Sequence, residues 1–207
     1  RSVAHLAALK GSLPFINFFD GFRTSHEIQK VEVMEFEKFR DLLDWDALKR
    51  FRQHALNPDV PEIRGTAENP DIYFQHCEAN NKYYDAMPDI VADYMAKISE
   101  ITGRDYKLFN YYGAADAEYV VVAMGSLSDV VKQAVKYLNG KGEKVGLINV
   151  HLYRPFSAKH LQAVLPKSVK KIAVIDRTKE PGAMGEPLYL DVVNFAKEVG
   201  LDADIIG

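Results

Sequence analysis

The chain has 207 residues, of which 47% are hydrophobic and 27% charged, the composition of an ordinary globular protein. This composition excludes intrinsic disorder, and no apolar stretch approaches the roughly 18 residues that a membrane span requires. The 26 basic and 29 acidic residues give a net charge of −3, and neither half has the basic excess of a nucleic-acid-binding protein. The length predicts one or two domains of about 100–200 residues each.

The cysteine content restricts the chemistry that the chain supports. Cys77 is its single cysteine, so it forms no disulfide within the chain and cannot by itself hold zinc or an iron–sulfur cluster. A reduced, cytoplasmic protein is therefore expected. The sequence begins at Arg1 rather than Met, without the apolar region of a signal peptide, so we expect it to be a piece of a larger chain.

The first half of the chain is predicted to be mostly helical, with one strand. Apolar residues at helical spacing predict a helix over residues 2–10. The compact run of aromatic and branched residues 13–19 predicts a buried strand. Thr24 or Ser25 would then cap another helix, because Glu27 lies at capping-box spacing from Thr24.

Further helices are expected before residue 105. Two short amphipathic helices fall within residues 34–56, and Asp44 is the expected cap of the second. The density of proline, glycine and asparagine over residues 57–72 predicts an extended linker. One long helix is expected over residues 78–101, with a kink or boundary near Pro88 and a stop at Thr102-Gly103.

Regular alternation of strands and helices begins near residue 106. Apolar strands are predicted over 119–124, 144–150, 171–176 and from 204, with helices over 129–138, 157–165 and 186–199. Ser128 is the expected cap of the first of these helices. Strands apolar on both faces need helices on both sides, so the fold class is α/β with a three-layer parallel sheet. The predicted domains are residues 1–105 and 106–207.

The clearest chemical cluster in the first half follows the predicted strand, over residues 18–27. In parallel α/β folds, ligands bind beyond the carboxyl ends of strands. Arg23 and His26, with the amides of a helix start, are therefore candidate contacts for an anion or a neighbouring domain. The structural alternative is that Asp20 and Arg23 satisfy a turn, with His26 and Glu27 on the first turn of a helix.

Three further clusters follow strands of the second half. The junction 124–128 would place a phosphate on a helix N-terminus, but its single glycine matches neither GxGxxG nor the P-loop, and a plain turn is the alternative. In residues 150–156, Arg154 or His151 would face a neighbouring domain or serve a turn. In residues 176–182, Arg177, Lys179 and Glu180 form either a solvated loop or a contact with an anion or another domain.

These clusters do not add up to a catalytic or metal site. No nucleophile lies beside a base in a recognisable motif, and no histidine pair has metal-ligand spacing on one helix. We therefore assign no catalytic, cofactor-binding or metal-binding residue from the sequence.

Five longer motifs, taken together and in order, resemble the pyruvate:ferredoxin (flavodoxin) oxidoreductases. They are Pro14–Glu27, Arg64–Gln75, Tyr112–Glu118, Val150–Phe156 and Asp176–Gly182. The resemblance extends over essentially the whole chain. It implies a multidomain enzyme that decarboxylates pyruvate on thiamine diphosphate with Mg²⁺, transfers the acetyl group to coenzyme A and passes electrons through [4Fe–4S] clusters to ferredoxin or flavodoxin.

The resemblance also implies a place for this chain within such an enzyme. It corresponds to the end of the pyrimidine-binding domain with one remaining strand, a connecting segment, and a domain similar to the C-terminal domain of transketolases. The family's catalytic residues, its CoA domain and its cysteine-rich domain lie outside these residues, so we expect a non-catalytic part that binds no cofactor alone. Its partners would be the other domains of the same chain, in an enzyme expected to be a homodimer. The alternative is a self-standing α/β module that binds a small anion or nucleotide through Arg23, Ser126 or Arg177.

Overall fold

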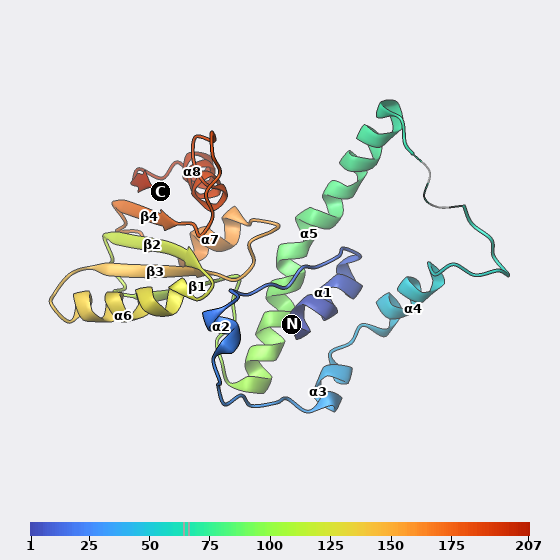
Figure 1. Cartoon of the computed structure of the whole chain (residues 1–207), viewed down its shortest axis with the longest axis horizontal. Helices are drawn as coiled ribbons and strands as arrows, with labels where there is room; N and C mark the ends of the chain where they lie inside the picture. Colours follow the sequence, from blue (N-terminus) through green and yellow to red (C-terminus); the bar gives the residue numbers. More distant parts are fainter. Residues whose placement is uncertain (64, 66) are drawn as a thin grey trace. The chain divides into compact units, whose positions relative to one another are not determined.

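The computed structural model describes residues 1–63, 65 and 67–207 (Figure 1). Arg64 and Thr66, which belong to the motif Arg64–Gln75, lie outside the described residues. The chain divides into two compact units. Unit 1 comprises residues 1–17 and 31–104, and unit 2 comprises residues 18–30 and 105–207. This division differs from the predicted one because the short segment 18–30 belongs with the second half.

Unit 1 is helical, with α1 (Ser2–Gly11), α3 (Phe36–Asp41), α4 (Trp45–Gln53) and α5 (Pro70–Thr102). Helix α1 packs against α5 and α4. At Gly11, a Cβ atom would lie 2.3 Å from Cε of Met87, so glycine allows α1 and α5 to approach closely. Ala7, Met87 and Val91 are almost fully buried in this unit. Its stability therefore rests on apolar contact between helices rather than on strand pairing.

The predicted helices of unit 1 are confirmed, although α5 begins earlier than expected. Asp44 caps α4, because its Oδ1 accepts a hydrogen bond of 2.9 Å from the amide of Ala47. Helix α5 starts at Pro70. Proline suits this first position because the N–H that it lacks would have no partner within the helix there. The last part of the predicted linker is thus helical. Pro88 lies inside α5, and Gly103 ends it in a left-handed conformation.

Two predictions near the start of the chain are wrong. Residues 13–19 form no strand, and the side chains of Ile16, Phe18 and Phe19 are 87%, 66% and 61% exposed. A strand must pair its backbone with a neighbour, and the described five-stranded sheet does not include this segment. The single-turn helix α2 (Arg23–His26) has no side-chain cap, and Glu27 follows its last residue in an extended conformation, so the capping box is absent as well.

Unit 2 contains a five-stranded sheet in the order β1-β3-β2-β4-β5. Its strands are β1 (Phe109–Gly113), β2 (Tyr119–Met124), β3 (Val145–Val150), β4 (Lys171–Ile175) and β5 (Asp204–Ile206). Strands β2 to β5 pair in parallel, with Val122 opposite both Ile148 and Val174. Strand β1 pairs antiparallel with β3, so the expectation of a purely parallel sheet is wrong at this edge. Mixed sheets with one antiparallel edge strand are common in α/β folds.

Helices cover both faces of this sheet, which confirms the predicted three-layer α/β class. They are α6 (Leu127–Asn139), α7 (Ala158–Val164) and α8 (Pro187–Val199). Figure 1 shows α6 on one side of the sheet and α7 and α8 on the other. Val131 and Val135 of α6 pack against Ala123 and Leu147 of the strands. On α8, Leu188 and Val192 are completely buried.

The start of α6 differs from the sequence-based expectation. Its N-cap residue is Ser126, and Ser128 does not cap the helix. The Ser128 side chain is instead buried and its hydroxyl donates a 2.7 Å hydrogen bond to Oδ1 of Asn149 on β3. A buried hydroxyl needs such a partner, because an unpaired one costs about 1–3 kcal/mol.

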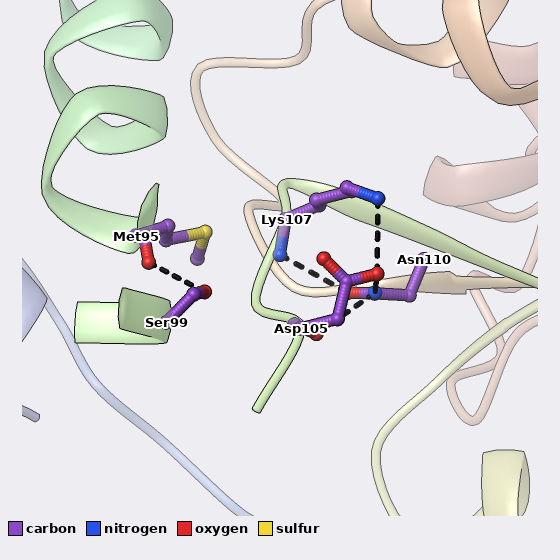
Figure 2. A network of polar contacts seen from close by, with 5 residues as sticks. All are labelled: Met95, Ser99, Asp105, Lys107 and Asn110. Carbon is purple, nitrogen blue, oxygen red and sulfur yellow. Dashed lines mark hydrogen bonds and ion pairs between the residues drawn. The ribbon is translucent and has the colours of Figure 1, made fainter. Parts of the chain in front are cut away.

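A polar turn leads into β1 (Figure 2). The buried Asn110 side chain accepts from the amide of Lys107 at 3.1 Å and donates to the carbonyl of Asp105 at 3.0 Å. The Lys107 ammonium pairs with the Asp105 carboxylate at 2.9 Å. Within α5, Ser99 donates back to the Met95 carbonyl at 2.8 Å.

Among the described residues, no helix is long and apolar enough to cross a membrane.

Candidate functional site

The loops that follow β2, β3 and β4 are the place where a parallel sheet gathers its functional groups. These three strands run in parallel, so their carboxyl ends share one edge of the sheet. Gly125-Ser126 follows β2, His151–Phe156 follows β3 and Asp176–Gly182 follows β4. Three of the four predicted clusters therefore lie at this edge.

The fourth cluster reaches the same edge through one side chain, that of Asp20. Its Oδ2 accepts a 2.6 Å hydrogen bond from the amide of Ser126, at the N-terminus of α6. The same oxygen lies 2.8 Å from Nη1 of Arg177, which follows β4. Nη1 of Arg177 also donates to Oγ of Ser126 at 2.9 Å. The sequence made Arg177 a candidate contact for an anion or another domain and Ser126 a candidate only in the alternative anion-binding module, and the structure pairs both with a carboxylate of the chain itself.

The backbone at Gly125 is shaped for this carboxylate. Gly125 has φ of +70°, and a Cβ atom there would lie 2.8 Å from Oδ2 of Asp20. Any side chain would therefore collide with the carboxylate and adopt a strained conformation. Glycine leaves the amide of Ser126 accessible to an anionic oxygen, as in helix N-termini that bind phosphate.

The electrostatics of this contact favour an ionised Asp20. The pKa of Asp20 is lowered mainly by hydrogen bonds from Ser126, and the positive charge of Arg177 lowers it further. Partial burial of the carboxylate raises its pKa, but this effect is smaller than that of the hydrogen bonds and the positive charge together. The positive end of the α6 dipole is thus occupied by a fixed internal anion.

A second carboxylate occupies the N-terminus of α8. Oδ1 of Asp176 accepts from the amide of Leu188 at 3.2 Å, and its Oδ2 accepts from the amide of Tyr189 at 3.0 Å. At two helix starts of this unit, backbone donors that would suit a phosphate are satisfied by aspartates of the chain. A diphosphate at the start of α6 would have to displace the Asp20 carboxylate from the Ser126 amide.

Arg23 and His26, the other predicted contacts of the first cluster, lie on the exposed turn α2. Nδ1 of His26 lies 2.5 Å from the carbonyl oxygen of Phe22, and the Ser25 hydroxyl donates to that carbonyl at 2.9 Å. Phe22 itself has φ of 53° and ψ of −104°, an unusual conformation for a residue other than glycine. The turn is closed by local contacts and presents Arg23 to solvent.

The predicted contacts of the third cluster are satisfied within unit 2. Nη1 of Arg154 lies 2.6 Å from Oδ2 of Asp191 on α8, and its guanidinium lies 4.0 Å from the ring centroid of Tyr153. His151 lies 3.3 Å from the Asn149 amide nitrogen, which extends the buried pair formed by Ser128 and Asn149. Burial lowers the pKa of His151, and the nearby Lys132 charge lowers it further.

The fourth cluster forms a compact loop after β4. Nζ of Lys179 lies 2.8 Å from Oε1 of Glu186, and this contact lowers the pKa of Glu186. The carbonyl of Glu180 accepts from the amide of Ala183 at 3.2 Å, which closes a turn. Lys179 and Glu180 thus shape the loop that carries the fully exposed Met184.

Sequence reasoning missed two polar arrangements because both depend on tertiary contacts or on geometry within a turn. The Ser128–Asn149 pair joins residues from α6 and β3. The signal in the sequence was that each is a polar residue within an otherwise apolar segment. Oγ of Ser157 lies 2.8 Å from Nδ1 of His160, where Ser157 is the N-cap residue of α7. In the described part of the chain, no three His, Cys, Asp or Glu side chains are grouped to hold a metal ion.

An open hollow of about 450 Å³ lies on α4 of unit 1. Its lining consists of Trp45, Leu48, Lys49, Arg52, Gln53 and Asn57. No site was expected here, and none of the candidate contacts lines this hollow.

Two family models match the chain, one in each half. Residues 2–96 match "Pyruvate flavodoxin/ferredoxin oxidoreductase, thiamine diP-bdg", and residues 117–203 match "Pyruvate:ferredoxin oxidoreductase core domain II". The chain is similar to a pyruvate-flavodoxin oxidoreductase of Klebsiella pneumoniae, with 65% identity over 93% of the chain and 16% of that protein. It is also similar to a pyruvate:ferredoxin oxidoreductase of Moorella thermoacetica, with 60% identity over 99% of the chain and 18% of that protein. The chain thus spans less than a fifth of the length of these relatives.

Among solved structures, a 2-oxoglutarate:ferredoxin oxidoreductase from Magnetococcus marinus is similar at 15% identity with a TM-score of 0.43. The match covers 72% of this chain and 24% of that one. A transketolase from Pichia stipitis is similar at 26% identity over 36% of this chain and 12% of that one, with a TM-score of 0.29. At these TM-scores neither likeness carries an argument about the site.

Proposed function

Because the chain belongs to the pyruvate:ferredoxin (flavodoxin) oxidoreductase family, we propose that it is a structural part of an enzyme that oxidatively decarboxylates pyruvate. The products of that enzyme would be acetyl-CoA and CO₂, with ferredoxin or flavodoxin as electron acceptor. The observation that carries this proposal is the order of the two family matches, over residues 2–96 and then 117–203 of one chain.

The proposed enzyme would contain thiamine diphosphate with Mg²⁺ and [4Fe–4S] clusters, and it would use coenzyme A as co-substrate. Cys77 is the single cysteine here, whereas such a cluster takes about four cysteine ligands, so other domains would hold the clusters. We further propose that the chain works next to those domains in a cytoplasmic homodimer.

A structural role is supported by the way unit 2 uses its charged groups. Arg154, Arg177 and Lys179 were candidate contacts for a ligand or another domain, and each pairs with a carboxylate of its own unit. Asp20 and Asp176 occupy the starts of α6 and α8. These contacts stabilise a scaffold and leave few donors aimed at a substrate.

The alternative of a self-standing anion-binding module is weakened by the same contacts. Its proposed ligands were Arg23, Ser126 and Arg177. Two of these already bind the Asp20 carboxylate, which is present at high effective concentration because it belongs to the same chain. A free anion at millimolar concentration would have to compete with it.

The test of the proposed function compares the 207-residue chain with the full-length enzyme that contains it. We expect the full-length enzyme to reduce viologen dye in the presence of pyruvate and coenzyme A. The 207-residue chain should show no such turnover and no calorimetric binding of thiamine diphosphate with Mg²⁺. Turnover by the short chain would contradict the structural role, and a full-length enzyme inactive towards pyruvate would contradict the substrate.

The same preparation tests the alternative. Calorimetry with phosphate at millimolar concentration should show no saturable binding to the 207-residue chain. Saturable binding that Arg177→Gln abolishes would instead support an anion-binding module at the start of α6.

A further inference from the structure

We infer that Asp20, Ser126 and Arg177 form a latch that holds segment 18–30 on the α/β unit and can open while the sheet stays folded. The segment is separated from α6 by about half the chain, and Asp20 is 106 positions away from Ser126. Its attachment therefore depends on tertiary contacts, which can be broken separately from the strands and helices of unit 2.

The latch is the described polar attachment of this segment to the rest of unit 2. Hydrogen bonds and ion pairs described for the other residues of 18–30 join residues within the segment, such as Ser25 to Phe22 and Gln29 to Glu27. Among the contacts described for this segment, only those of the Asp20 carboxylate reach another part of unit 2, through Ser126 at 2.6 Å and Arg177 at 2.8 Å. Removing this carboxylate should therefore release the segment.

Apolar burial gives the segment little additional support. The side chains of Phe22 and Ile28 are 81% and 101% exposed, and α2 is a single turn. A segment with few buried apolar contacts and few remote hydrogen bonds belongs to the least stable part of a fold. Its ordered state thus depends mainly on the latch.

Backbone strain next to the latch points in the same direction. Phe22, two positions after Asp20, has φ of 53° and ψ of −104°. Such a conformation persists in a residue with a side chain only where the surroundings enforce it. Opening the latch would release the turn that carries Arg23 and His26 from its fixed orientation on the sheet unit, while hydrogen bonds from Ser25 and His26 to the Phe22 carbonyl still close the turn itself. Asp20 is therefore a positioning residue for that turn.

Unit 2 offers a closely matched control for the experiment. Asp191 pairs with Arg154 at 2.6 Å, and the two side chains are 23% and 50% exposed. Asp20 pairs with Arg177 at 2.8 Å, and these side chains are 24% and 52% exposed. The two ion pairs are alike in geometry and exposure, but Asp191 lies on α8 and holds no remote segment.

The experiment is limited trypsin digestion of the 207-residue chain, followed by mass spectrometry at the cleavage sites Arg23 and Lys30. Asp20→Ala should raise cleavage at these sites about tenfold, because it removes the charge-assisted hydrogen bonds that hold the segment. Asp191→Ala should leave cleavage at both sites unchanged. The exchange rate of the Ser126 amide should rise in Asp20→Ala, while β3 amides keep their protection.

A third variant opens the latch from the other side. Gly125→Ala places a methyl group 2.8 Å from Oδ2 of Asp20, too close for the carboxylate to keep its place, so it should also raise cleavage at Arg23 and Lys30. In the Asp20→Ala background, Gly125→Ala should add no further cleavage. The inference is overturned if Asp20→Ala leaves both sites as resistant as before, or if β3 loses protection to the same extent.

Discussion

The Asp20 carboxylate lies where its charged form is favoured, with Ser126 and Arg177 both donating to it. A carboxylate whose pKa is lowered in the folded state contributes stability above its unfolded pKa of about 3.9. That contribution is lost as the pH falls through the lower, folded pKa. The latch should therefore remain closed at mildly acidic pH and open only in stronger acid.

We expect a titration of the Asp20 carboxyl carbon by NMR to give a midpoint below the ordinary value for aspartate. Hydrogen bonds from Ser126 are the largest cause of the lowered pKa, and the Arg177 charge acts in the same direction. Ser126→Ala and Arg177→Gln should each move the midpoint upward. A wild-type midpoint at the ordinary value would contradict the described contacts.

Arg177 and Ser126 were predictable as anion contacts because both follow strands of an α/β fold. Their partner was not predictable in the same way, since local spacing carries no information about a residue 106 positions away. Asp20 was expected only to satisfy a turn. The partner could not be identified from the sequence because a helix N-terminus attracts any anion, whether a ligand or a side chain of the chain itself.

Gly146 on β3 should be intolerant of even a methyl group. A Cβ atom there would lie 2.3 Å from Oη of Tyr111, whose hydroxyl is held by a hydrogen bond to the Ala114 carbonyl. Overpacking of this kind costs about 1–3 kcal/mol. We expect Gly146→Ala to lower the free energy of unfolding of unit 2 by this amount, measured by native-state exchange of β3 amides under urea.

Gly140 provides the comparison for that substitution. It ends α6 with φ of −65° and ψ of −16°, a helical conformation open to alanine, and an added Cβ would lie 3.3 Å from the Tyr137 carbonyl oxygen rather than within 3 Å of any atom. Gly140→Ala should change the free energy by less than about 1 kcal/mol or raise it slightly. Equal losses in the two variants would show that the Tyr111 contact is not the cause.

At the scale of elements, helices were predicted well because their signals are local. Apolar spacing and the Asp44 cap place α4 within a few residues, and Gly103 marks the end of α5. Strands depend on pairing with other strands, which local sequence does not show, and the errors in the predicted elements concern strands. The apolar run 13–19 remains unpaired in the described sheet, whereas β1, which contains the polar Asn110, was not predicted.

Helix α4 should be sensitive to its cap because its surface is mostly exposed. Asp44→Ala removes the acceptor for the amide of Ala47, which should cost the helix about 1 kcal/mol. We expect faster amide exchange at Ala47 and through the first turn of α4. Asp44→Asn keeps a side-chain acceptor and should preserve most of the protection, so equal exchange in the two variants would contradict the capping role.

At the scale of the whole molecule, the chain enters unit 2 briefly at residue 18, returns to unit 1 at residue 31 and enters unit 2 again at residue 105. Length and composition indicated one or two domains. They could not show that thirteen residues from the first half belong with the second, because that assignment depends on tertiary contacts. The predicted division at residue 105 therefore stays a proposal for the domains of the family.

This interleaved path has a consequence for the order in which the protein folds. The Asp20 carboxylate has no site to bind until β2 and α6 have formed the Gly125-Ser126 junction, and closing so long a loop early is entropically costly. The contact should therefore be absent from the folding transition state. In pulse-labelling during refolding, the Ser126 amide should gain protection after the β2 and β3 amides, and Asp20→Ala should speed unfolding while leaving the refolding rate unchanged.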